Sequence, residues 1–276
     1  MCPNCRAFIT ISDRVCPYCE AQVGPRAVDL RPNAFAASFL PSANLSAIIL
    51  LAINLAWFFL ELALSHSLRQ PSFDAGVTYA PYIVRGGQWW RLISAGFLHA
   101  NWSHLLMNSW SLFILVTEVE QFYGTNRLIV AYVVSTLSGF LCAAIFTPQS
   151  PILGASCAAF GLMGIMLAMG VAGNRADPLT QLVRQHYGQW LVFGLVMSLP
   201  LPFFGFSRHI SLSGHVGGLV GGFVVGLVAG RPGHPSSPRE VFWKTVAYAA
   251  IAVVLLCWYL DFMNIANILK HSSASM

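Results

Sequence analysis

The chain has 276 residues, of which 56% are apolar and only 9% are charged. Soluble domains carry about 25% charged residues, so this composition excludes an ordinary soluble enzyme. An aromatic content of 13% excludes a disordered chain. The net charge of +5 does not come from clustered Lys and Arg, which argues against a nucleic-acid-binding protein. The composition therefore predicts an all-α polytopic protein whose surroundings are a lipid bilayer.

The first 24 residues hold four of the seven cysteines, in two CxxC pairs separated by ten residues: Cys2, Cys5, Cys16 and Cys19. Two such turns can direct four sulfurs at one tetrahedral Zn²⁺. The alternatives are two unrelated reduced pairs or a redox pair. We expect a zinc ribbon over residues 1–24, stabilised by its metal and similar to the minimal ribbons at the ends of bacterial membrane proteins. It would either recruit a cytoplasmic partner or only stabilise the N-terminus. Residues 25–42, which contain three prolines, read as a linker.

Seven apolar segments follow, each of roughly the length that crosses a bilayer. They cover about residues 43–64, 103–119, 128–146, 155–171, 189–206, 214–229 and 241–262. Pro178 and Pro238 fall between the predicted spans, where loops tolerate proline. Residues 65–102 are rich in Trp and Tyr, which favour the headgroup level, so we expect a structured loop in the outer membrane interface.

Charge placement orients the predicted spans. With a cytoplasmic N-terminus, ten of the 15 Lys and Arg residues fall in inside segments. Cytoplasmic loops carry the excess of Lys and Arg, so this orientation is favoured. An odd number of spans then predicts that the C-terminus lies outside.

Three spans carry polar groups near their predicted outer ends. His104 and Asn108 are four residues apart and share one helix face, Ser156 opens the fourth span, and His215 opens the sixth. Polar groups at membrane depth are costly, which makes each a candidate for function. Each alone is more often explained by packing or by an interhelical hydrogen bond. Their common depth favours a shared site.

Glycines indicate which of these spans touch. In the sixth span Gly214, Gly218, Gly222 and Gly226 recur every four residues, and the fourth span is also rich in glycine. Such stripes let helix backbones approach closely. Close packing of the two spans would bring the Ser156 hydroxyl to an imidazole, and a serine is a weak nucleophile until an adjacent base takes its proton.

With these motifs the chain resembles the rhomboid family of intramembrane serine proteases over about residues 43–230. The segment 231–276 is similar to the extra C-terminal helix of some rhomboids. The motifs that carry the resemblance are Trp90-Arg91, the pattern His99, His104 and Asn108, the ending Glu120 to Gly124, Gly154 to Ser156, and His215 with its glycines. The resemblance implies a six-helix bundle with a seventh transmembrane helix, in a bacterial plasma membrane.

The resemblance also implies roles for individual residues. Ser156 and His215 would form a catalytic dyad that needs no cofactor. His104 and Asn108 would form the oxyanion hole, and Phe160 would stack on the catalytic imidazole.

Six further positions bear on this assignment. His99, Gly154, Trp90 and Arg91 would support the site, and Glu120 would be structural. Cys157 stands where rhomboids usually have glycine, and it would either narrow the pocket or place a thiol beside the nucleophile.

The implied function is a serine endopeptidase that cleaves single transmembrane helices of membrane proteins near the outer leaflet. One alternative is a catalytically silent rhomboid-like protein that binds or escorts membrane helices. A transporter would use His99, His104 and His215 as a polar path. That function predicts polar groups through the whole membrane depth, whereas these groups cluster in the outer half. The chain has no HExxH motif, which argues against a metalloprotease.

Overall fold

The computed structural model describes residues 5, 15–22, 44–65, 76–173, 176–198, 211–230 and 232–274. The predicted linker at 25–42, Cys2 and the end of the predicted fifth span lie outside these residues. The chain divides into two compact units, Met1–Ser42 and Ala43–Met276. In the first unit, an antiparallel bridge between Val15 and Gln22 closes a short turn that carries Cys16 and Cys19.

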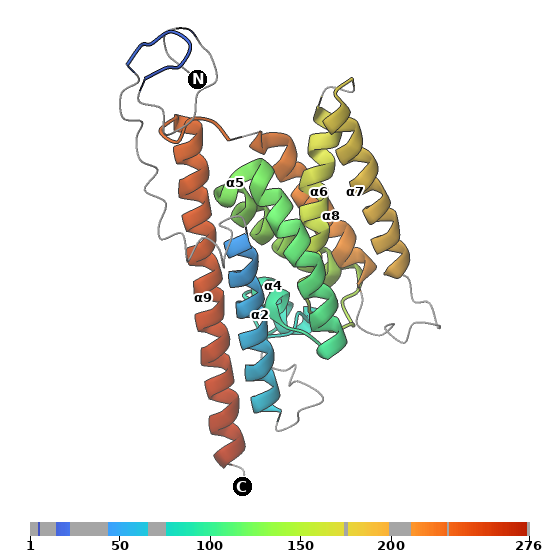
Figure 1. Ribbon diagram of the computed structural model, residues 1–276. Helices are drawn as coiled ribbons and strands as arrows, with labels where there is room; N and C mark the ends of the chain where they lie inside the picture. Colours follow the sequence, from blue (N-terminus) through green and yellow to red (C-terminus); the bar gives the residue numbers. More distant parts are fainter. Residues whose placement is uncertain are drawn as a thin grey trace. The chain divides into compact units, whose positions relative to one another are not determined.

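The described part of the second unit is helical (Figure 1). Its elements are α2 (Leu45–Leu64), α3 (Ala80–Val84), α4 (Arg91–Ser94), η2 (Ala95–Phe97), α5 (Trp102–Phe146), α6 (Ser156–Ala172), α7 (Pro178–Met197), α8 (Leu212–Ala229) and α9 (Pro238–Ala274). Helix α5 is two helices joined at a kink, where Gly124 has φ 75° and ψ 161°. A positive φ is readily adopted only by glycine. The kink separates the predicted spans at 103–119 and 128–146.

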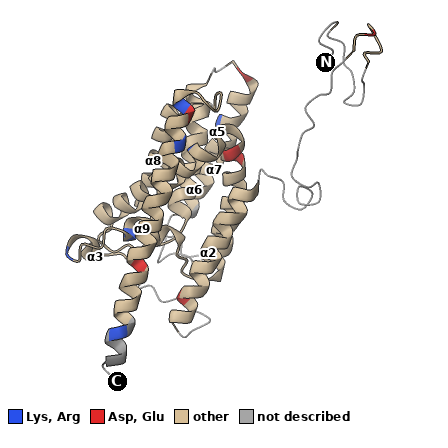
Figure 2. Ribbon diagram, turned by 90° about the vertical axis from the view of Figure 1, so that its left-hand side faces the viewer, with Lys and Arg blue, Asp and Glu red and all other residues tan. Residues whose placement is uncertain are grey.

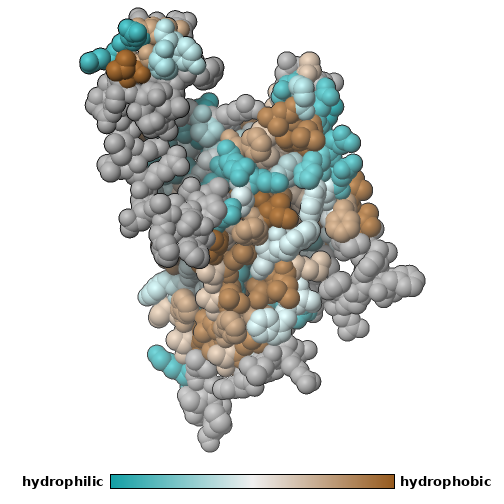
Figure 3. Space-filling model, viewed as in Figure 1, coloured by the Kyte–Doolittle hydropathy of each residue, from teal (hydrophilic) through white to brown (hydrophobic). Residues whose placement is uncertain are grey.

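Four helices, α2, α5, α8 and α9, are long and apolar enough to cross a membrane, and α6 is a shorter apolar helix. The charged residues of this unit lie mainly towards the ends of the bundle (Figure 2). Apolar side chains cover much of the middle of the face in Figure 3. These features confirm the predicted all-helical membrane fold, while the number of spans stays a prediction.

The predicted fifth span begins too late. Helix α7 starts at Pro178, about eleven residues before the predicted start at residue 189. Asp177 caps it by accepting from the Thr180 N–H at 3.2 Å, and proline fits the first helical position because it has no N–H to leave unpaired. The first half of α7 is rich in polar residues, so its hydropathy did not indicate a membrane-spanning helix there. Pro238 likewise begins α9 instead of lying in a loop.

The glycine stripe of α8 packs directly against α6, as predicted. A Cβ built on Gly218 would lie 2.1 Å from the Cys157 carbonyl oxygen, and one on Gly222 would lie 1.9 Å from the Gly161 carbonyl oxygen. Only glycine permits this approach of two backbones. The α6–α8 pair forms the rigid centre on which the site is built.

A buried ion pair joins the end of α8 to α5 and α9. The Arg127 guanidinium, 1% exposed, donates to both Glu240 carboxylate oxygens at 2.7 Å and to the Ala229 carbonyl oxygen at 3.0 Å. Paired charges are tolerated in an interior when their hydrogen bonds are complete. This contact anchors the start of α9 to the bundle.

Candidate active site

Ser156 and His215 are brought together by the α6–α8 interface. Ser156 is the first residue of α6, and His215 lies in the first turn of α8. The His215 Nε2 atom is hydrogen-bonded to the Ser156 Oγ atom at 2.8 Å. Phe160, one turn after Ser156, stacks on the imidazole with a centroid distance of 4.1 Å and an interplanar angle of 13°. An alcohol in contact with a neutral imidazole nitrogen can be activated as a nucleophile.

The second imidazole nitrogen contacts a residue that the sequence did not indicate. The Ser198 hydroxyl lies 2.5 Å from His215 Nδ1 and also donates to the Gly194 carbonyl oxygen at 2.7 Å. Ser198 caps the C-terminus of α7 and is 5% exposed. No pattern in the sequence marks this serine, because its contact depends on how α7 packs beside α8.

The turn before Ser156 is covered by two side chains from α5. Gly154 has φ +124°, and a Cβ there would lie 2.7 Å from His104 Cε1 and 3.5 Å from Asn108 Nδ2. The Asn108 side chain is buried, and its Nδ2 atom has no hydrogen-bond partner among the described residues. The Ser156 backbone N–H belongs to the first turn of α6, where N–H groups lack intrahelical partners. The His104 ring and the Asn108 amide thus lie beside the turn that precedes Ser156.

His99 is buried next to His104. It is 1% exposed, and its ring packs edge-on against His104 with a centroid distance of 5.4 Å. Burial, together with the nearby His104, lowers the pKa of His99 to about 3. His99 is therefore neutral near pH 7, where it adds no charge to the site.

The side chain of Cys157 is buried between α5 and α8. It is 2% exposed, and a Cβ built on Gly139 would lie 2.6 Å from the Cys157 Cβ atom. The Cys157 sulfur would lie 3.1 Å from a Cβ on Gly214. The thiol fills space between the second arm of α5 and α8.

The rhomboid domain model matches residues 86–232, which include every residue of this site. The chain belongs to the rhomboid family. It is 28% identical over 179 residues to rhomboid protease GluP of Bacillus subtilis, covering 64% of this chain and 32% of that protein. It is 32% identical over 137 residues to the putative rhomboid protease YdcA of the same organism, covering 49% of this chain and 65% of that protein. Rhomboid-like protease 1 of Toxoplasma gondii is 29% identical over 204 residues, or 71% of this chain and 67% of that protein.

These matches confirm the family that the motifs indicated. This rhomboid spans about a third of the length of GluP and just under two thirds of YdcA.

In this rhomboid the loop between α3 and α5 is hydrogen-bonded to the turn before Ser156. Arg91, 2% exposed, donates to the Val77 carbonyl oxygen at 3.0 Å and accepts through its own carbonyl from the Thr78 hydroxyl at 2.7 Å. The Gly154 N–H donates to the Ala95 carbonyl oxygen at 2.9 Å. Arg91 therefore shapes a loop whose backbone holds the turn before Ser156.

The neighbouring Trp90 connects the same loop to the last helix. Its indole N–H donates at 3.1 Å to the carboxylate of Asp261, a fully buried residue of α9. Helix α9 therefore braces this loop.

Glu120 lies far from the dyad of this rhomboid. It accepts from the Ser46 and Thr125 hydroxyls, each at 2.6 Å, and so joins α2 to α5 beside the Gly124 kink. Twelve residues of helix separate it from Asn108, about 18 Å along the axis. This location fits the structural role expected for it.

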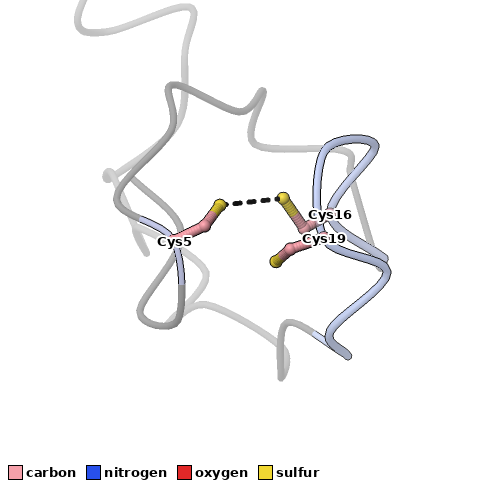
Figure 4. Close-up of side chains that lie close together, drawn as sticks. All are labelled: Cys5, Cys16 and Cys19. Carbon is pink, nitrogen blue, oxygen red and sulfur yellow. Dashed lines mark hydrogen bonds between the residues drawn. The ribbon is translucent and has the colours of Figure 1, made fainter.

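Three cysteines of the first unit, Cys5, Cys16 and Cys19, lie close together (Figure 4). The sulfurs of Cys5, Cys16 and Cys19 lie within 4.8 Å of one another, and those of Cys5 and Cys16 are 3.7 Å apart. A tetrahedron with Zn–S bonds of about 2.3 Å has sulfurs separated by about 3.8 Å, whereas disulfide sulfurs are bonded at about 2.05 Å. The spacing fits thiolates that share a metal ion.

Proposed function

We propose that this rhomboid is an intramembrane serine endopeptidase that cleaves single transmembrane helices near the outer leaflet. The observation that carries the proposal is the 2.8 Å contact between Ser156 Oγ and His215 Nε2 beside a buried, unpartnered Asn108 amide. The Asn108 amide supplies a hydrogen-bond donor on the same side of the turn that precedes Ser156. The names of the relatives, which include proteases, support the same reaction class.

In the proposed first step, the Ser156 hydroxyl attacks the carbonyl carbon of the scissile bond and His215 Nε2 takes the hydroxyl proton. Negative charge then develops on the carbonyl oxygen. The Asn108 amide, the His104 imidazole and the Ser156 backbone N–H would donate to that oxygen. Losing one such donor costs about 2.7–4 kcal/mol of transition-state stabilisation in a serine hydrolase.

In the second step the C–N bond breaks, and the His215 imidazolium gives its proton to the leaving amine. Water then attacks the acyl group on Ser156 with His215 again as the base, which frees the acid product and restores the hydroxyl. The Phe160 ring limits rotation of the imidazole through both steps because the two rings are stacked.

We also propose that Cys2, Cys5, Cys16 and Cys19 hold one structural zinc ion in a ribbon over residues 1–24. Four cysteine ligands close the coordination sphere, so the metal would stabilise the ribbon and take no part in proteolysis. A cytoplasmic N-terminus would place these thiols in a reducing compartment. In that orientation the first turns of α5, α6 and α8, which carry His104, Ser156 and His215, would face the outer leaflet.

Reconstituted protein tests the main proposal. We expect a transmembrane reporter in liposomes to be cleaved by wild type and left intact by Ser156→Ala and by His215→Ala. Two exposed residues remote from the proposed dyad provide matched controls, Ser236→Ala and His186→Ala, and both should cleave at the wild-type rate. Persistent cleavage by folded Ser156→Ala would refute the protease assignment, and absence of cleavage by wild type would favour a silent, helix-binding protein.

A further inference from the structure

We propose that Ser198 is a positioning residue for the His215 base: its hydroxyl accepts the Nδ1 hydrogen of the imidazole and holds Nε2 unprotonated towards Ser156. This inference rests on the proposed function. It adds a third group to the predicted dyad and assigns α7 a part in catalysis.

The neighbouring Gly194 carbonyl, which also accepts from the Ser198 backbone N–H at 3.0 Å, indicates the direction of this hydrogen bond. A serine hydroxyl has one hydrogen, and the Ser198 hydroxyl lies 2.7 Å from the Gly194 carbonyl oxygen, which can only accept. The hydroxyl therefore donates to Gly194 and meets His215 Nδ1 through a lone pair. Nδ1 must then carry the hydrogen of the neutral imidazole, which leaves Nε2 as the acceptor facing Ser156.

The opposite arrangement would disable the base. If Ser198 donated to Nδ1, the imidazole hydrogen would sit on Nε2 and point at Ser156. That nitrogen could not take the hydroxyl proton. Among the described residues, no carboxylate is hydrogen-bonded to His215, so the choice of tautomer falls to Ser198.

Packing fixes Ser198 relative to the ring. Ser198 and His215 are 5% and 6% exposed, so water does not readily replace either partner. A Cβ on Gly194 would lie 2.9 Å from Phe160 Cζ, which means that α7 reaches the ring stack through a glycine. The Phe160 ring lies on the imidazole, and Ser198 follows Gly194 by one helical turn. The contact between Gly194 and Phe160 therefore also positions the Ser198 hydroxyl at Nδ1 of His215.

The expected effect is smaller than that of a carboxylate partner. A neutral hydroxyl fixes the tautomer but does not neutralise the imidazolium that forms in the transition state. We expect Ser198→Ala to lower kcat about tenfold with little change in KM, the size expected for one lost buried hydrogen bond. Ser198→Thr keeps the hydroxyl and should restore kcat.

The test combines kinetics with the tautomer of His215. Long-range ¹H–¹⁵N correlations of histidine-labelled protein in micelles, assigned by the signal lost in His215→Ala, should show the Nδ1–H form in wild type and in Ser198→Thr. Ser198→Ala should show a mixture with the Nε2–H form. Ser65→Ala is the matched control, because Ser65 also caps a helix C-terminus and donates to its own helix but is not hydrogen-bonded to His215.

An Nε2–H form in wild type would overturn the proposal, and this measurement needs no variant to fold. Unchanged kcat and tautomer in Ser198→Ala would also overturn it, as would a loss of kcat without a change of tautomer, which marks a merely structural role. The protease assignment fails separately, through absence of cleavage by wild type, so the two failures are distinguishable.

Discussion

The two nitrogens of His215 face two helices, α6 and α7, which differ in how closely they are packed. Nε2 faces α6, where Gly218 and Gly222 of α8 touch the backbone of the neighbouring helix. Nδ1 faces α7, where a Cβ on Gly188 would meet nothing within 4 Å and Phe193 is 57% exposed. The distance between alcohol and base is therefore set by a rigid interface. The orientation of the imidazole depends on α7, a helix that is packed on α6 but open on its outer face.

Contacts between α7 and α5 are correspondingly sparse. The Tyr187 hydroxyl donates to the Glu118 carboxylate, and the rings of Trp110 and Trp190 lie 5.5 Å apart. Side chains, not backbones, make these contacts with α5, whereas against α6 a Cβ on Gly170 would lie 3.0 Å from the Arg184 Cα atom. The comparison suggests that reactivity is built into α6 and α8 and that α7 adjusts it.

The largest expected effect comes from Gly222→Ala. The new Cβ would lie 1.9 Å from the Gly161 carbonyl oxygen, a backbone atom that cannot rotate away. Overpacking of this kind costs about 3 kcal/mol or more. We expect the thermal unfolding midpoint in detergent to fall steeply and cleavage to be lost.

Gly188→Ala is the matched control for that change. With open space around the new methyl group, alanine should stabilise the helix by up to about 1 kcal/mol. Equal unfolding midpoints for Gly222→Ala and wild type would contradict the claim that α6 and α8 form a rigid interface.

A smaller effect is expected from Tyr187→Phe, which removes the hydrogen bond to Glu118. The loss of one such bond costs about 1 kcal/mol, and α6 and α8 remain packed. We expect a modestly lower unfolding midpoint and a Ser156 that reacts with a fluorophosphonate at close to the wild-type rate. A reaction slowed as severely as in Gly222→Ala would show that α7 carries as much of the site as α8 does.

The smallest effect on the helical unit is expected from removal of zinc. Cys16→Ser, or treatment with a chelator, should lower the zinc content measured by mass spectrometry. The unfolding midpoint of the helices should stay unchanged, because the cysteines belong to a separate compact unit. Cys142→Ser is the control that should retain zinc, and a zinc-free wild-type protein would refute the ribbon.

The sequence predicted the packing of α6 on α8 and the contact between Ser156 and His215 for a physical reason. The glycines that allow close approach and the positions of Ser156 and His215 are local features of two apolar helices. The α7 half was predicted poorly. Its start at Pro178 follows from a cap and not from hydropathy, and the contact of Ser198 exists only once three helices have packed.

The most direct measurement is to react the purified protein with a fluorophosphonate and map the adduct by peptide mass spectrometry. An activated serine held by α6 and α8 predicts one adduct, on Ser156, that disappears in His215→Ala. Folded wild-type protein that forms no adduct, or one on another serine, would contradict the account.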